Sequence, residues 1–112
     1  MTNRGTSYIE CMLRYCKIIE DIQIKNNKDY KEFLKNPEYQ MSLCFALEQI
    51  GEQAKKLRDL GYHTKYPELQ LNQIAGLRNK IVHGYDSIDL NMVFDITIYD
   101  IPDLASKLKN IC

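Results

Sequence analysis

Residues 36–61, NPEYQMSLCFALEQIGEQAKKLRDLG, decide the fold of this 112-residue chain. Asn36 followed by Pro37 is typical of a helix start, because asparagine caps free backbone N–H groups and proline fits the first turn. The apolar residues that follow recur at steps of four and three, as on the buried face of a bundle helix: Leu43, Leu47, Ile50, Ala54 and Leu57. Gly61 can end this helix in the left-handed conformation.

The segments on either side have the same helical periodicity. An N-terminal helix has one apolar face, formed by Tyr8, Ile9, Met12, Cys16, Ile19 and Ile22. A turn at residues 26–27 and a short amphipathic segment over residues 28–35 lead into the long helix. Beyond it, we predict a loop over residues 62–69, a helix from Leu71 to Gly84, and a last helix capped by Ser87 or Asp89. Pro102 should kink or divide that last helix near Tyr99.

These elements predict an all-α antiparallel four-helix bundle with a short extra helix and a kinked C-terminal helix, in a single domain over residues 1–112. The chain is 45% hydrophobic and 27% charged, which is ordinary globular composition. It has no apolar stretch near the roughly 18 residues of a membrane span, and its polar N-terminus has no signal-peptide core. We therefore expect a soluble, cytoplasmic protein.

Four cysteines and two histidines are too widely spaced to predict a common metal site. No Cys-x-x-Cys pair occurs, and the histidines, His63 and His83, are twenty residues apart. We expect reduced thiols, with Cys44 filling the core, and neither a metal nor a cofactor.

A second stretch, residues 76–85 (GLRNKIVHGY), concentrates chemically active side chains around the end of a predicted helix. Arg78 offers a planar fork of donors that matches a phosphate and stays charged. His83 has a reference pKa near 6.5 and can exchange a proton near neutral pH. Together they can act on a phosphodiester, the arginine holding the phosphoryl oxygens and the histidine moving a proton at the attacking or leaving oxygen.

The spacing of these two residues limits how they can act together. Five residues on an ideal helix separate the side chains by about 140° around the axis and about 7.5 Å along it. They converge if the helix ends near Val82 and the chain turns at Gly84, or if a second copy of the chain completes the site. A surface role, or that of a cation at a helix C-terminus, also fits the spacing alone.

Other residues near this stretch have alternatives of the same kind. Glu48 and Glu52 form a like-charge pair one turn apart, which either faces solvent or takes Arg78 as its cation. His63, in the predicted loop, is expected to be solvated. Tyr85 also fits an aromatic residue at the edge of a bundle.

The same stretch resembles a known family. Arg78, His83 and Tyr85 reproduce the Arg-x4-His-x-Tyr signature of the HEPN superfamily, specifically of the HepT-like toxins. Residues 47–57 (LEQIGEQAKKL) resemble the family's Gly-Glu helix and residues 101–104 (IPDL) its last helix, so the likeness covers nearly the whole chain. Leu71 departs from the pattern, since relatives often have tryptophan there; this difference concerns packing.

The resemblance implies a HEPN-like homodimer that acts as a metal-independent endoribonuclease. It implies that His83 helps to activate the ribose 2′-hydroxyl and that Arg78 stabilises charge on the scissile phosphate, with Asn79 and Glu52 in support. Family members are commonly encoded with a nucleotidyltransferase antitoxin that adds AMP to the motif tyrosine, here Tyr85. The implied partners are RNA and this antitoxin, with no DNA. The alternative is a non-catalytic dimeric helical subunit, regulatory or nucleotide-binding, that docks on a nucleotidyltransferase.

The net charge of zero conceals two opposed regions. Residues 55–80 contain six basic residues against two acidic ones, whereas residues 86–103 contain five aspartates and neither lysine nor arginine. Overall neutrality argues against a protein that binds nucleic acid by bulk charge. A local basic region leading to Arg78 is still compatible with RNA binding that is modest in affinity and strongly salt-sensitive.

Overall fold

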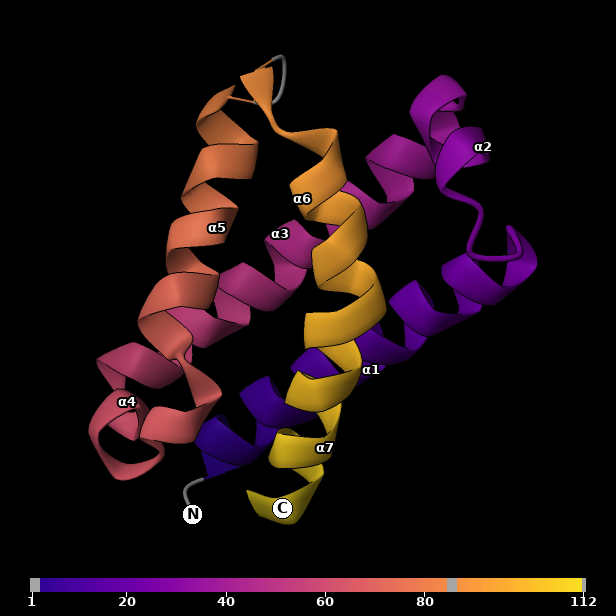
Figure 1. Cartoon of the computed structure of the whole chain (residues 1–112). Helices are drawn as coiled ribbons and strands as arrows, with labels where there is room; N and C mark the ends of the chain where they lie inside the picture. Colours follow the sequence, from indigo (N-terminus) through magenta and orange to yellow (C-terminus); the bar gives the residue numbers. More distant parts are fainter. Residues whose placement is uncertain (1–2, 85–86, 112) are drawn as a thin grey trace.

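The helix predicted over residues 36–61 is α3 (Pro37–Asp59) in this computed structural model, which describes residues 3–84 and 87–111 (Figure 1). Asn36 caps it as predicted, because its Oδ1 accepts a hydrogen bond from the backbone N–H of Tyr39 at 3.1 Å. Gly61 lies just beyond its other end with φ +90°, in the left-handed conformation. Both predicted ends are confirmed.

The remaining helices pack around α3 in two layers (Figure 1). α1 (Asn3–Lys25) is joined to α3 by the short α2 (Tyr30–Lys35) and packs along it. α5 (Leu71–Gly84) lies across α3 on the same side as the last arm of the chain. That arm consists of α6 (Leu90–Asp95), a π-helical turn (Ile96–Asp100) and α7 (Ile101–Ile111), and α7 packs on α1. The described residues contain no strand, so the predicted all-α class is confirmed.

The predicted apolar faces meet in one core. The residues fully excluded from solvent include Ile9, Met12, Ile19, Leu43, Ile50, Leu57 and Leu108. Gln23, Tyr39 and Thr97 form a polar cluster inside this core, where the Gln23 amide donates to Thr97 Oγ1 at 2.8 Å and the Tyr39 hydroxyl donates to Gln23 Oε1. Thr97 in turn donates to the Phe94 carbonyl at 2.7 Å, so each buried group has a partner.

The loop predicted over residues 62–69 is wrong in part. The structure has a short helix, α4 (Tyr62–Lys65), followed by a 3-10 turn (Pro67–Leu69). Tyr62 and Leu69 are buried, and the Tyr62 ring lies where a side chain at Gly5 would stand. Burial of these two apolar residues orders the segment. The local sequence did not predict this, because it has only glycine and proline signals and no helical repeat.

The interruption predicted near Tyr99 is confirmed as the π-helical turn between α6 and α7. Pro102 has no N–H to donate to the carbonyl four residues before it, so regular α-helical bonding cannot continue through this point. Asp89 caps the arm, since its Oδ1 accepts from the N–H groups of Asn91 and Met92 at 3.0 and 3.2 Å. Of the two predicted caps, the structure therefore uses Asp89.

Candidate active site on helix α5

α5 brings the candidate site residues against α3. Leu71, Ala75 and Ile81 bury its inner face. Gly51 on α3 allows the close approach, because a Cβ there would overlap the Cβ of Arg78 and lie 3.1 Å from the Ile74 carbonyl oxygen. The lack of a side chain at Gly51 thus lets the Cβ and Cγ of Arg78 pack directly against α3.

Glu52, the next residue on α3, holds the charged end of Arg78. Arg78 Nε lies 3.0 Å from Glu52 Oε2, and the two side chains are 24% and 34% exposed. The buried Nε–H is not directed at the carboxylate and makes no hydrogen bond with it, so the contact is an ion pair. Arg78 Nη1 donates to Asn79 Oδ1 at 3.0 Å. Of the two alternatives for Glu52, the ion pair with Arg78 is the one observed.

His83 lies in the last turn of α5, and its side chain is exposed. The helix stays regular to Gly84, whose carbonyl accepts a hydrogen bond from Ser87 Oγ at 3.1 Å. An early end near Val82, one of the two predicted ways to bring the pair together, is therefore wrong. Within one chain, Arg78 contacts α3 while His83 faces solvent.

The other residues singled out from the sequence do not join this site. Tyr85 lies outside the described residues. His63 is exposed on α4, where its Nδ1 lies 3.1 Å from the Arg58 carbonyl oxygen. Among residues 3–84 and 87–111, no cluster of His, Cys, Asp and Glu is arranged to hold a metal ion.

The buried thiols are not candidates for a nucleophile. Cys44 is buried in the core, as predicted, and burial raises its pKa to about 11. Burial also raises the pKa of Cys16 to about 12. A thiol that stays protonated at neutral pH is a poor nucleophile.

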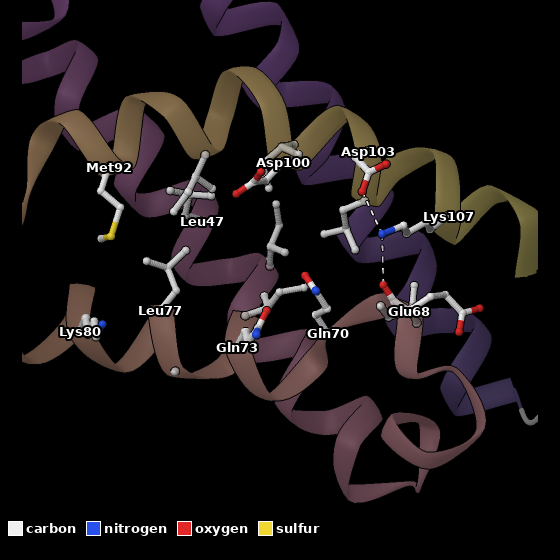
Figure 2. Close-up of a pocket in the computed structure, with 17 residues that line it drawn as sticks. Leu47, Glu68, Gln70, Gln73, Leu77, Lys80, Met92, Asp100, Asp103 and Lys107 are labelled. Carbon is white, nitrogen blue, oxygen red and sulfur yellow. Dashed lines mark hydrogen bonds and ion pairs between the residues drawn. The ribbon is translucent and has the colours of Figure 1, made fainter.

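Sequence reasoning missed a groove between α5 and the α6–α7 arm (Figure 2). We call it the α5–α7 groove; its apolar floor and walls include Leu47, Ile50, Ile74, Leu77, Met92 and Leu104. Its cavity of about 490 Å³ is lined at the edge by the polar residues Gln70, Gln73, Lys80 and Asp100. The one local signal in the sequence was Gly76, a glycine in the interior of a helix that also lines this groove.

The fold and the site together define a class of protein: an all-α helical bundle of HEPN type with an Arg-x4-His motif on one helix. The ribonuclease HepT-like family matches residues 12–111, and the chain belongs to this family. No solved structure matches the chain.

Named relatives agree with this assignment. The chain is 32% identical over 91 residues to "Putative RNase MJ1216" of Methanocaldococcus jannaschii, which covers 80% of this chain and 74% of the relative. It has the same identity over 91 residues to "Putative RNase MJ0125" of that organism, covering 80% and 77%. "Probable ribonuclease HepT" of Thermococcus cleftensis is 26% identical over 111 residues, covering 99% of this chain and 98% of the relative. No helix within the described ranges is long and apolar enough to cross a membrane.

Proposed function

We propose that the chain is a metal-independent endoribonuclease, the toxin of a toxin–antitoxin pair, in which Arg78 and His83 act on an RNA phosphodiester in the cytoplasm. Family membership supports the ribonuclease class. The observation that carries the site assignment is the arrangement on α5, where Arg78 is held in place by Glu52 and His83 is exposed at the helix end. One group is fixed for charge stabilisation and the other is accessible for proton transfer.

The reaction needs only these two kinds of group. His83 accepts the proton of the ribose 2′-hydroxyl, and the 2′-oxygen forms a bond to phosphorus while the bond from phosphorus to the 5′-oxygen breaks. A protonated imidazole or water returns a proton to the departing 5′-oxygen. Arg78 stabilises the charge that develops on the non-bridging phosphoryl oxygens. The products are a 2′,3′-cyclic phosphate and a free 5′-hydroxyl.

A homodimer is part of this proposal. Ideal helix geometry separates Arg78 and His83 by about 140° around α5, too far for both to reach one small phosphate. Support for a second copy comes from an apolar surface beside the arginine: Met41, Phe45 and Val82 are 59%, 56% and 39% exposed and line a shallow groove between α3 and α5. Val82 is one turn beyond Arg78, so a second copy that covers this surface with its own equivalent surface, as in a two-fold dimer, would bring its α5 near the arginine.

The proposal includes regulation by a partner nucleotidyltransferase. The Tyr85 hydroxyl oxygen attacks the α-phosphorus of an ATP held by that partner, the pyrophosphate group leaves, and the phenolic proton passes to a base or to water. The attached AMP adds a negatively charged phosphodiester two residues after His83. A fixed anion at this position competes with RNA phosphate for Arg78 and obstructs access to the histidine.

Cleavage of RNA by AMP-free protein in EDTA tests the nuclease. His83→Ala should abolish cleavage, while His63→Ala, the change of the other histidine, should cleave at the wild-type rate. Arg78→Lys keeps the charge but loses the planar fork, so cleavage should fall strongly without loss of fold. Equal cleavage by His83→Ala and wild type would overturn the assignment.

Intact mass of protein co-expressed with the neighbouring nucleotidyltransferase tests the regulation. We expect an increase of one or more AMP groups, mapped to Tyr85 by peptide sequencing and absent from Tyr85→Phe. A tight complex with that partner, together with no RNA cleavage in any modification state, would instead identify the chain as a non-catalytic subunit.

A further inference from the structure

One residue that lines the α5–α7 groove is a locally unfavourable choice. Gly76 lies in the interior of α5, where glycine is about 1 kcal/mol less favourable than alanine. A Cβ at Gly76 would meet nothing within 4 Å, so packing inside the chain does not require the glycine. Gln70, at the start of α5, has φ 54°, a left-handed backbone that ends the 3-10 turn and lets its carbonyl accept from the N–H groups of Gln73 and Ile74 at 3.1 Å. The glycine at position 76 is explained if a ligand approaches α5 closely from the groove.

The polar groups at the edge of the groove are free to bind a ligand. Figure 2 shows Gln70 and Gln73 pointing from the α5 side toward the opposite wall, which carries Asp100. Within the described ranges, neither side-chain amide makes a hydrogen bond, and Lys80 and Asp100 make no ion pair. An amide offers both donors and an acceptor, and a carboxylate accepts from an amino group.

The far end of the groove differs, because its charges are already paired. The Lys107 ammonium lies 2.9 Å from Asp103 Oδ2 and donates to the Glu68 carbonyl at 3.3 Å (Figure 2). These contacts join α7 to the 3-10 turn and close the groove at that end. The other lysine of the groove, Lys80, which makes no ion pair within the described ranges, lies at the opposite end, three residues before His83 on α5.

We propose that the α5–α7 groove binds one unpaired nucleobase of the RNA, with Lys80 holding a phosphate of the same strand. This inference rests on the proposed ribonuclease function and names a base-reading subsite for it. Lys80 and His83 are separated by about 60° around the α5 axis and about 4.5 Å along it. A strand whose base lies in the groove therefore passes Lys80 and continues toward His83. The Gln70 and Gln73 amides and the Asp100 carboxylate would read the polar edge of the base.

The chemistry of the groove favours a nucleobase over a helix from a protein partner. Apolar walls enclosing a few convergent polar groups, in a cavity of about 490 Å³, are typical of a small-ligand site. A docked helix would fill the apolar floor with aliphatic side chains and would leave the amides of Gln70 and Gln73 without specific hydrogen-bond partners. An unpaired base uses the apolar walls for its two faces and the amides for its edge.

Binding of fluorescently labelled, uncleavable 2′-O-methyl hexanucleotides of A, C, G or U, followed by anisotropy, tests the subsite. We expect wild type to prefer one base over the others by several-fold. Gln73→Leu should remove that preference. Gly76→Leu, which places a side chain at the edge of the groove, should weaken binding about tenfold or more without lowering the thermal midpoint. Asn72→Leu, also exposed on α5 but outside the groove lining, is the matched control and should bind as wild type.

Lys80→Gln tests the phosphate contact separately. It should weaken all four oligonucleotides alike and reduce the slope of log affinity against log salt by roughly 0.7. In cleavage assays, Gln73→Leu should raise KM with little change in kcat, which separates a base-reading residue from a catalytic one.

The outcomes distinguish this inference from the proposed function. RNA cleavage by wild type together with unchanged binding and base preference in Gly76→Leu and Gln73→Leu overturns the subsite and leaves the nuclease standing. Base-selective binding that these variants remove supports the subsite even if wild type cleaves nothing, in which case the nuclease fails alone. If Gly76→Leu instead disrupts the complex with the nucleotidyltransferase and leaves RNA binding intact, the groove docks a protein and the inference is wrong.

Discussion

Two glycines in the middle of facing helices should respond in opposite ways to the same substitution. In Gly51→Ala, the new Cβ on α3 overlaps the Cβ of Arg78 and lies 3.0 Å from its Cγ and 3.1 Å from the Ile74 carbonyl oxygen. In Gly76→Ala, the new Cβ on α5 meets nothing within 4 Å. The pair therefore compares a crowded contact with an open position.

The expected magnitudes follow from helix propensity and overpacking. Each alanine gains about 1 kcal/mol of helix propensity over glycine. Gly51→Ala also overpacks the contact between α3 and α5 at a cost of about 1–3 kcal/mol. The upper part of that range applies, because a Cβ and a backbone carbonyl move only if the helix moves. Since the propensity gain is common to both variants, the difference in unfolding free energy between them reports the overpacking alone.

Urea and thermal unfolding, followed by far-UV circular dichroism at one protein concentration, measure this difference. Gly76→Ala should be up to about 1 kcal/mol more stable than wild type, and Gly51→Ala up to about 2 kcal/mol less stable. Each kcal/mol corresponds to about 4 °C or more in Tm for a domain of this size. If both variants rise in stability by the same amount, α3 and α5 do not approach at Gly51 as described, and the positioning of Arg78 has to be reconsidered.

Three further predictions concern residues away from the α3–α5 crossing. Burial raises the pKa of Cys16 to about 12 and of Cys44 to about 11. The folded state therefore binds more protons than the unfolded state above about pH 9, and the unfolding free energy should fall from pH 8.5 to 11, less steeply in Cys16→Ala. Thr97→Val removes the acceptor of the buried Gln23 amide and should cost about 1–3 kcal/mol, whereas adding Gln23→Leu should cost less than the sum in a double-mutant cycle. Because its ion pair is partly exposed, Glu52→Gln should lower the unfolding free energy in urea by under about 1 kcal/mol. Its rate of RNA cleavage should fall by more than the loss of folded protein accounts for.

The fold was predictable wherever the sequence carries a repeat or a local cap. The four- and three-residue steps over residues 43–57 and the pair Asn36-Pro37 predicted α3 with its start, and Gly61 predicted its end. The segment from Tyr62 to Leu69 was not predictable in this way. Its two short helical turns depend on burying residues against partners far away in the sequence, such as Gly5, and a local pattern contains no such information.

The candidate site was predictable to the extent that it lies in one short stretch. Arg78 and His83 are neighbours on α5, and their residue types suggested phosphodiester chemistry. The α5–α7 groove was not predictable, because Gln73 and Asp100 are ordinary exposed polar residues until the fold places them on opposite walls. Gly76 was a usable signal, since a glycine inside a helix is unfavourable and no contact within 4 Å requires it here.

The two proposed tasks of α5, catalysis and substrate selection, use opposite sides of the helix. The side toward α3 carries Arg78, and Val82, one turn further on, belongs to the apolar surface proposed for a second copy. Lys80 and Gly76 line the other side, where the α5–α7 groove is. A second copy that covered the first side would leave the groove open, so the proposed dimer and the proposed base subsite would not compete for the same surface. His83 is near the end of the helix, where, in such a dimer, a strand held by the groove of one chain would pass toward the arginine of the other.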